Sequence, residues 1–277
     1  MLRIGRFIVC VLLVVTSSIL AQGTPAARAE RRAGAGHLPA SIEAFYRVSF
    51  GPLENIGSLQ FRSDVNGDDY TLFANAKVEA VVLEYVGQMQ SSGSLLSAET
   101  KPASYMYHYR QKPLIGKKKD ATLRMGFDES GVTEIAPRSD FWKRDVPITA
   151  QDLKDVLDPL SAVMALSLGE VAAPCDRKLP IFDGKLRFDL VFQPTGRPVG
   201  PKGAVVCRVT LIPIAGHNNG QGSDKVISGE IEVTLQPVPE ANLVIPILVR
   251  VPTIVGTAVL KSQKVQITMP DHHRFAL

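Results

Sequence analysis

The feature that most constrains the fold is a two-residue alternation of apolar and polar side chains, which recurs along most of the chain. It is clear in residues 46–50 and 185–192, where every second residue is Tyr, Val, Phe or Leu. Successive side chains of a β-strand point to opposite faces, so this period is typical of strands with one buried face. The sequence therefore predicts a mainly β protein whose sheet has one apolar side.

Turn signals separate the alternating segments. Asn66-Gly67-Asp68 lies between two of them, and Asn-Gly pairs are favoured in the turns of β-hairpins. Many strands with one helical interruption predict a strongly curved antiparallel sheet or an open β-barrel. The predicted strands span 46–50, 58–62, 72–78, 84–96, 104–110, 121–127, 131–135, 185–192, 205–211, 231–235, 243–251 and 256–268.

One helix is predicted, over residues 149–168. Thr149 is the expected N-cap, since an acid follows three residues later, and apolar residues then repeat at helical spacing. Pro159 stands inside the segment, which predicts a kink or a second short helix that begins there. The apolar stripe of this helix is expected to cover the sheet. Its acids are expected on a solvated face: Asp152, Asp155 and Asp158.

Residues 1–29 have the composition of a secretion signal. Two arginines precede an apolar run at 7–15, and Ala27 and Ala29 supply an A-x-A cleavage site. The run is shorter than the roughly 20 residues of a membrane-spanning helix. We therefore expect a signal peptide that is cleaved after Ala29 and a location in the periplasm. A retained N-terminal anchor is the alternative.

The charge of the chain gives little reason to expect a nucleic-acid partner. Removal of residues 1–29 takes away three arginines and no acid, so the formal charge falls from +4 to +1. Nucleic-acid binding usually requires a clustered basic face. A local basic run is compatible with peripheral contact to anionic lipid headgroups, and also with a solvated hairpin tip, which is the preferred interpretation: Lys112, Lys117, Lys118 and Lys119.

The organisation after the signal is simple. Residues 30–40 read as a flexible lead-in, residues 41–270 as a single β domain without an internal linker, and residues 271–277 as a tail. Two cysteines remain after signal removal, Cys175 and Cys207. An oxidising compartment favours a disulfide between them. We expect a monomer.

The sequence lacks the patterns of common active sites. No histidine pair has the spacing of zinc ligands on a helix, and residues 64–69 depart from the EF-hand spacing, so neither a metal nor a cofactor is predicted. No nucleophile elbow, P-loop or dinucleotide fingerprint occurs. We predict that the protein is not an enzyme. The alternative is an enzyme whose active-site pocket is formed by His108, Asp183 and Arg187. Three tyrosines that alternate with His108 are expected to form cross-strand aromatic pairs: Tyr105, Tyr107 and Tyr109.

Several segments together resemble one bacterial family. The more specific ones are Cys175, the run 179–190 with its Phe-Asp-Gly, Cys207, and the Pro-Ile-Ala-Gly at 213–216. On these residues the chain resembles the DUF3108 family of bacterial envelope proteins. The resemblance extends to the strand at Tyr46-Arg47-Val48, a turn at Lys101-Pro102-Ala103 and the helix segment Asp158-Pro159-Leu160-Ser161.

The resemblance implies a shape similar to the open barrels of periplasmic lipoprotein carriers, which hold acyl chains between a curved sheet and a helical lid. The leading hypothesis is therefore a non-catalytic periplasmic protein of envelope maintenance that binds a lipid or a lipoprotein acyl chain in the concave sheet. The alternative is a periplasmic scaffold with a filled core and an envelope protein as partner. An outer-membrane barrel fits poorly, because Arg250, Lys261 and Lys264 recur within predicted strands. The sequence names no ligand-binding residue.

Overall fold

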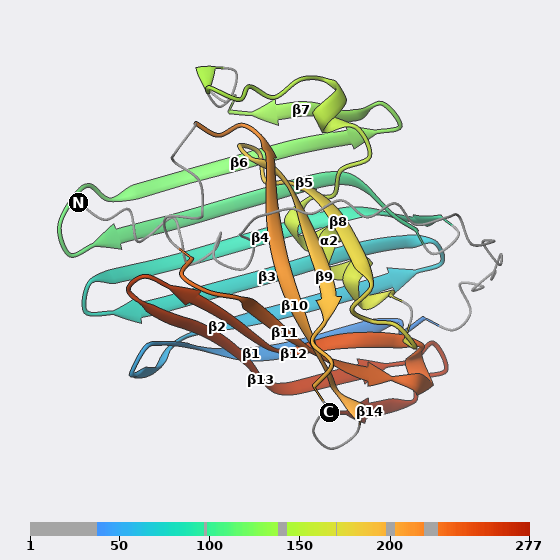
Figure 1. Ribbon diagram of the computed structural model, residues 1–277. Coiled ribbons are helices and arrows are strands. Elements are labelled where there is room, and N and C mark those ends of the chain that lie inside the picture. The colour runs from blue at the N-terminus through green and yellow to red at the C-terminus, as the bar shows by residue number, and fades with distance from the viewer. Residues whose placement is uncertain (1–37, 97–98, 138–142, 170, 198–202, 219–226) are drawn as a thin grey trace.

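The computed structural model describes residues 38–96, 99–137, 143–169, 171–197, 203–218 and 227–277. The predicted signal peptide and most of the predicted lead-in lie outside these residues. The described chain forms one antiparallel sheet of 14 strands and one α-helix (Figure 1). The strands are β1 (Ser41–Phe50), β2 (Leu53–Asn66), β3 (Asp69–Ala80), β4 (Leu83–Leu96), β5 (Glu99–Pro113), β6 (Lys119–Asp128), β7 (Gly131–Ala136), β8 (Arg177–Phe182), β9 (Arg187–Pro194), β10 (Val205–Ala215), β11 (Ile231–Val238), β12 (Leu243–Thr253), β13 (Gly256–Thr268) and β14 (Arg274–Ala276).

The sheet consists of two meanders that meet at one strand pair. Strands β1 to β7 are neighbours in chain order, as are β8 to β13, and pairing of β1 with β13 joins the two sets. The order across the sheet is therefore β7 to β1 followed by β13 to β8, with β14 beside β13. Strands β7 and β8 are its edges, so the sheet curls but does not close. This confirms the predicted mainly β, open and strongly curved architecture.

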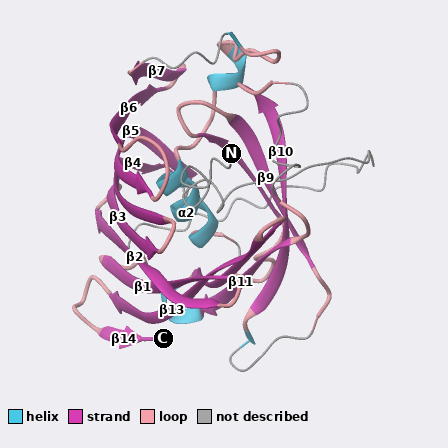
Figure 2. Cartoon of the chain, turned by 90° about the vertical axis from the view of Figure 1, so that its left-hand side faces the viewer, coloured by secondary structure: helices cyan, strands magenta, loops and turns pink. Residues whose placement is uncertain are grey.

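Irregular pairing bends the strands. The register shifts between β1 and β13 at Phe45/Tyr46, between β4 and β5 at Ser92/Gly93, and between β9 and β10 at Pro213/Ala215. A bulge adds one residue to one strand of a pair and increases the local twist. The strands consequently curl (Figure 2), and the buried apolar side chains of the core pack together with α2.

Helix α2 (Pro159–Ser167) lies inside this curl, between its two walls (Figure 2). Leu160 and Met164 pack with residues of β3 to β6, whereas Ala162 and Leu166 pack with residues of β8 to β12. Six of its nine residues are buried. A helix that is apolar on all sides is a core helix. It therefore fills the concavity, and it does not have the single apolar stripe that the sequence predicts.

The prediction of one helix over residues 149–168 is wrong in its first half. Gln151–Leu153 form only a short 3₁₀ turn, η4, at which the Thr149 hydroxyl donates to the Asp152 carboxylate (2.6 Å). The chain then leaves helical geometry, with Asp155 at a φ of 51°. Pro159 has no amide hydrogen and disfavours helical geometry at the residue before it. The alternative, a short helix that begins at Pro159, is confirmed.

Three other segments differ from the sequence prediction. The sequence does not predict β8, which is too short for its alternation to stand out. Part of the predicted tail forms β14, which pairs with Gln266–Thr268 of β13. The predicted turn at residues 101–103 lies inside β5, where Lys101 and Pro102 pair with Ser94 and Gly93 next to a register shift. Proline in a strand is tolerated at such a bulge.

Candidate functional site

An apolar pocket lies on the inner face of the curl, where β1, β2, β3 and β4 approach β12 and β13. Apart from Ser49 and Ser58, all of its lining side chains are apolar. The free volume is about 70 Å³, and the pocket is partly open. An apolar cavity of about 150 Å³ admits benzene. The pocket has less than half of that volume, so it has room for no more than the end of an apolar chain. Its lining residues include Phe50, Ile56, Val78, Met89, Val251 and Leu260.

A cluster of tyrosines stands beside the pocket. Val78 packs with Tyr85 and partly buried Tyr109. The rings of Tyr85 and Tyr109 stack across β4 and β5, and the hydroxyls of Tyr85 and Tyr107 are 2.6 Å apart. The predicted cross-strand aromatic pairing is thus confirmed. Gln111 pairs with Tyr85 in register, and its buried Oε1 has no hydrogen-bond partner among the described residues.

At the other end of the interior, a buried carboxyl group holds the start of α2. Asp158 is the N-cap, and its Oδ1 accepts the amides of Leu160 (2.9 Å) and Ser161 (3.1 Å). Its Oδ2 accepts the hydroxyls of Ser91 (2.8 Å) and Ser161 (2.5 Å). The Tyr70 hydroxyl lies 2.8 Å from that of Ser161. We call these four side chains, Tyr70, Ser91, Asp158 and Ser161, the buried polar cluster.

The prediction that Asp158 lies on a solvated face is wrong, because the chain itself fills the acceptor positions of this carboxyl group. Burial raises the pKa of Asp158 above its ordinary value, against the opposing effect of these hydrogen bonds. Asp-Pro in the sequence could have indicated the N-cap, but this pair carries no signal for burial. All four side chains of the cluster are at most 2% exposed. A substrate from solvent cannot reach them, so the cluster is structural.

A second buried acid ties β9 to its neighbours. Asp189 is 2% exposed and pairs with Arg187 (2.6 Å) and Lys178 (2.7 Å). The Arg187 Nε also donates to the backbone oxygen of Asp152 (3.1 Å). These contacts fasten η4 and β8 to β9.

The three residues of the enzyme alternative have separate local roles. The His108 Nε2 lies 2.8 Å from Asp120 in the neighbouring strand. Arg187 holds Asp189, as described above. Asp183 accepts two amides of the turn that starts β9, in which Gly184 has a φ of 88°. The structure therefore gives no geometric reason to group these three as a catalytic set.

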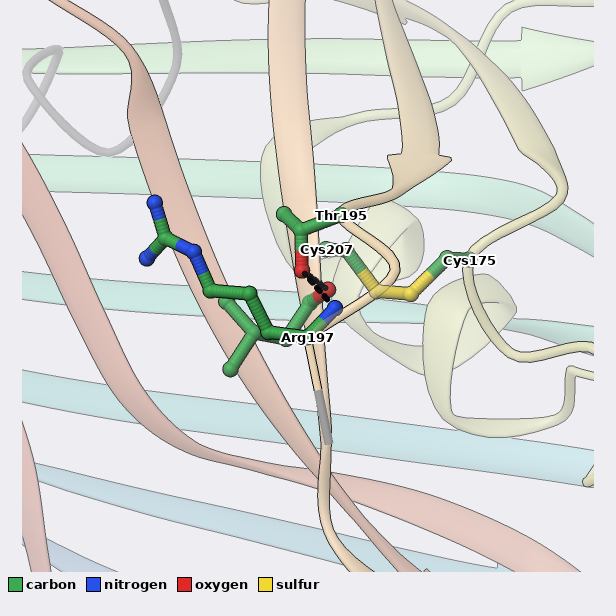
Figure 3. The surroundings of a disulfide bond; sticks show 5 residues. Cys175, Thr195, Arg197 and Cys207 are labelled. Carbon is green, nitrogen blue, oxygen red and sulfur yellow. Dashed lines mark hydrogen bonds between the residues drawn. A yellow bond between two sulfur atoms is a disulfide. The ribbon is translucent and has the colours of Figure 1, made fainter. Parts of the chain in front are cut away.

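The predicted disulfide between Cys175 and Cys207 is present, and both cysteines are buried. It joins the segment after α2 to β10. Figure 3 shows it beside the chain that leaves β9, where the Thr195 hydroxyl donates to the backbone oxygen of Val206 (2.9 Å). The disulfide and this hydrogen bond together fix the segment that follows α2 against the β9–β10 pair.

Within the described residues, no group of three or more His, Cys, Asp or Glu side chains could hold a metal ion. In the same part of the chain, no helix is long and apolar enough to cross a membrane.

The predicted basic run lies at the tip of the β5–β6 hairpin. Lys112 pairs with Glu84 (2.7 Å), and the other three lysines are exposed.

Comparisons with known proteins give a family and one similar solved structure. A family model described as "Protein of unknown function (DUF3108)" matches residues 46–262. A solved structure of a beta-barrel-like protein of domain of unknown function DUF1849 from Brucella abortus is similar, with 13% sequence identity and a TM-score of 0.45. The similarity covers 83% of this chain and 98% of that chain. No curated protein matches.

Proposed function

The chain belongs to the DUF3108 family, and we propose that it is a non-catalytic, monomeric protein of the bacterial periplasm that binds the acyl chain of a lipid or a lipoprotein. The observation that carries this proposal is the apolar pocket at one end of the curled sheet. Removal of residues 1–29 on export and an oxidising compartment that forms the Cys175–Cys207 disulfide belong to the same proposal.

The lining of the pocket favours an apolar ligand. Transfer of one CH₂ group from water to an apolar environment is favourable by about 0.8 kcal/mol. Six strands contribute apolar side chains to the pocket, and its free volume of about 70 Å³ suits the end of a chain rather than a whole lipid. We propose that the end of the acyl chain inserts between β3 and β12, and that the rest of the ligand extends over the mouth.

The same lining argues against catalysis at this place. No histidine, acid or lysine lines the pocket, so neither of its two serines has a general base there. The Ser49 hydroxyl accepts the amide of Asn55 (3.3 Å) and so has a structural role in the β1–β2 turn.

A pocket-filling substitution tests the proposal. Ala76→Leu adds three carbons at the pocket wall, and we expect at least a tenfold loss of affinity for the fluorescent fatty acid cis-parinaric acid. The matched control is Ala103→Leu, because Ala103 is exposed on β5 and does not line the pocket. Equal affinity of the two variants would contradict the proposal. So would native mass spectrometry that finds protein isolated from its own cell envelope free of any lipid.

The filled interior favours a second candidate, a periplasmic scaffold that binds an envelope protein. Helix α2 occupies the space between the two walls, which leaves the small pocket as the room for a ligand. In-cell crosslinking that yields one dominant protein partner, from protein that carries no lipid, would replace the lipid-binding proposal with this one.

A further inference from the structure

Exposed apolar side chains concentrate at one end of the strands. Ten large hydrophobic residues of the described chain are exposed, and seven of them lie at four hairpin turns. Val81 and Ile115 are 87% and 81% exposed. The turns join β1 to β2, β3 to β4, β5 to β6 and β12 to β13, at the left-hand ends of these strands in Figure 1. We call this set the apolar rim: Leu53, Val81, Val82, Leu114, Ile115, Ile254 and Val255.

The strand registers place the four turns at nearly one height. Val48, Val78 and Gln111 lie on one line across the strands, perpendicular to the strand direction, and we call such residues level. The line follows the register pairs Val48–Gly57, Gly57–Val78, Val78–Tyr85 and Tyr85–Gln111. The last strand residues before three of the turns lie two positions further on: Phe50, Ala80 and Pro113. Val251 is level with Phe50 through Ala258, so Thr253 is two positions beyond them. Two residues of strand span about 7 Å, and neighbouring hairpins are about 10 Å apart. The tips therefore form one row.

Positive charge accompanies this row. Lys117 and Lys118 follow the apolar pair Leu114–Ile115 in the same turn, and Lys119 begins β6. All three lysines are exposed, and none of them forms an ion pair with a described residue. The nearby acids are mostly engaged: Glu79 pairs with Lys77, Glu84 with Lys112, and Asp120 with His108. Glu54 is the acid on the rim without such a partner among the described residues.

We propose that the apolar rim docks on the surface of an anionic phospholipid bilayer, with its apolar tips among the headgroups and the three lysines on anionic lipid. Apolar groups beside cationic ones are the composition of interfacial membrane contacts, and anionic surfaces attract juxtaposed lysines. The apolar groups stand on separate turn tips. This arrangement suits insertion between headgroups better than it suits a flat protein interface, which buries a continuous patch.

The inference goes beyond the proposed function and does not rest on it. The pocket lies directly behind the rim, since Phe50 and Val251 line it and precede two of the turns. Docking would consequently bring the mouth of the pocket to the lipid surface. A rim that docks without an occupied pocket, or an occupied pocket without docking, is a distinct result in the experiments below.

Vesicle flotation tests the docking. The protein as isolated from cells is mixed with vesicles of phosphatidylglycerol and phosphatidylcholine, and the triple variant Val81→Ser/Ile115→Ser/Ile254→Ser is compared with Leu96→Ser. Leu96 is a matched control, because it is 55% exposed at a turn on the opposite end of the strands. We expect at least tenfold weaker binding for the triple variant and unchanged binding for Leu96→Ser. No vesicle binding by the unaltered protein, or equal loss in both variants, would overturn the proposal.

The charge component has its own test. Substitution of Lys117, Lys118 and Lys119 by Gln should reduce binding to the anionic vesicles several-fold and leave weak binding to vesicles of phosphatidylcholine alone unchanged. An unchanged preference for anionic vesicles would overturn the assigned role of the lysines. Concentration-dependent dimerisation that the triple rim variant abolishes, without vesicle binding, would assign the rim to a second copy of the chain and overturn the proposal.

Failure of the two proposals can be separated. The triple rim variant should retain affinity for cis-parinaric acid in the absence of vesicles, and Ala76→Leu should retain vesicle binding. If Ala76→Leu abolished flotation while its unfolding midpoint stayed normal, the pocket and not the rim would make the lipid contact, and the docking proposal would fall.

Discussion

The two ends of the strands are built differently. At the apolar rim the turns expose hydrophobic side chains, and the interior behind them holds a pocket. At the opposite end the turns contain Asn66–Asp69, Asp128–Gly131 and the 3₁₀ turn η7 (Pro239–Ala241), which are rich in ordinary turn residues, with Leu96 as an apolar exception. The buried polar cluster lies behind this polar end, since Ser91 pairs with Leu72, three residues into β3.

Under the docking proposal, this difference separates what holds the fold from what contacts other molecules. Turn chemistry at the polar end is what a solvated hairpin requires, and the interior there is filled by α2 and tied by hydrogen bonds. Nothing in the core explains why Val81 or Ile115 should be apolar, because both are more than four-fifths exposed. Exposed apolar side chains that gather in one place mark a contact surface. Stability and contact are therefore assigned to opposite ends of the same strands, which the following predictions test.

The largest loss of stability should come from the disulfide, which fixes the segment after α2 to β10. Cys175→Ser/Cys207→Ser opens a loop of 32 residues. In the chain-entropy model this costs roughly 3 to 4 kcal/mol. Urea unfolding of the double variant, compared with the unaltered protein with and without reductant, measures the change. A loss below about 1 kcal/mol would contradict the assigned role and would leave α2 held by packing alone.

The next largest effect should come from the N-cap of α2. Asp158→Ala removes four hydrogen bonds from a fully buried site, two of them donated by the hydroxyls of Ser91 and Ser161. We expect a loss of roughly 2 to 3 kcal/mol. Asp152→Ala is the control, because this acid is only partly buried and its carboxylate accepts the amide and hydroxyl of Thr149 at η4. It should cost less than about 1 kcal/mol, and equal losses in the two variants would show that burial of the carboxyl group contributes nothing.

Much of the sheet was predictable, because one face of each long strand is buried and the period-2 pattern records that directly. Residues 256–268 are predicted and observed with the same bounds. The short strands β8 and β14 contain too few residues for a period to stand out. Helix α2 was misjudged because its surroundings are apolar on both sides, and periodicity detects one-sided burial only.

The candidate site was less predictable than the fold. The pocket is lined by six strands from two distant parts of the chain, and their convergence depends on the β1–β13 pairing, which no local pattern encodes. The apolar turn tips could have been noticed, since Val81-Val82 and Leu114-Ile115 stand where turn residues are usually polar. Their alignment into one row required the strand registers.

A smaller effect should distinguish the buried carboxyl group by pH. Burial raises the pKa of Asp158 in the folded protein. Between the unfolded value, about 3.9, and the raised folded value, the folded state binds more protons than the unfolded state. The contribution of this group to stability is therefore fully present below the unfolded value and is lost as the pH rises through the folded value. Asp158→Asn should reduce this dependence, as measured by the urea midpoint across a pH series. An identical pH profile for the variant would refute the assignment.

The smallest expected change in stability concerns the apolar rim itself. Ile115→Ser should change the free energy of unfolding by less than about 0.5 kcal/mol, because the side chain is 81% exposed and surface substitutions usually have small effects. Leu72→Ala, at a fully buried position of β3, should cost roughly 2 to 5 kcal/mol in the same assay. If Ile115→Ser instead cost more than about 1 kcal/mol, the apolar tips would belong to the fold, and the contrast between the two ends would be structural. A change in the free energy of unfolding near zero, together with weakened vesicle binding, would place membrane contact and stability at separate ends of the sheet. A side chain that does not stabilise the folded state can be selected for its contacts with another molecule.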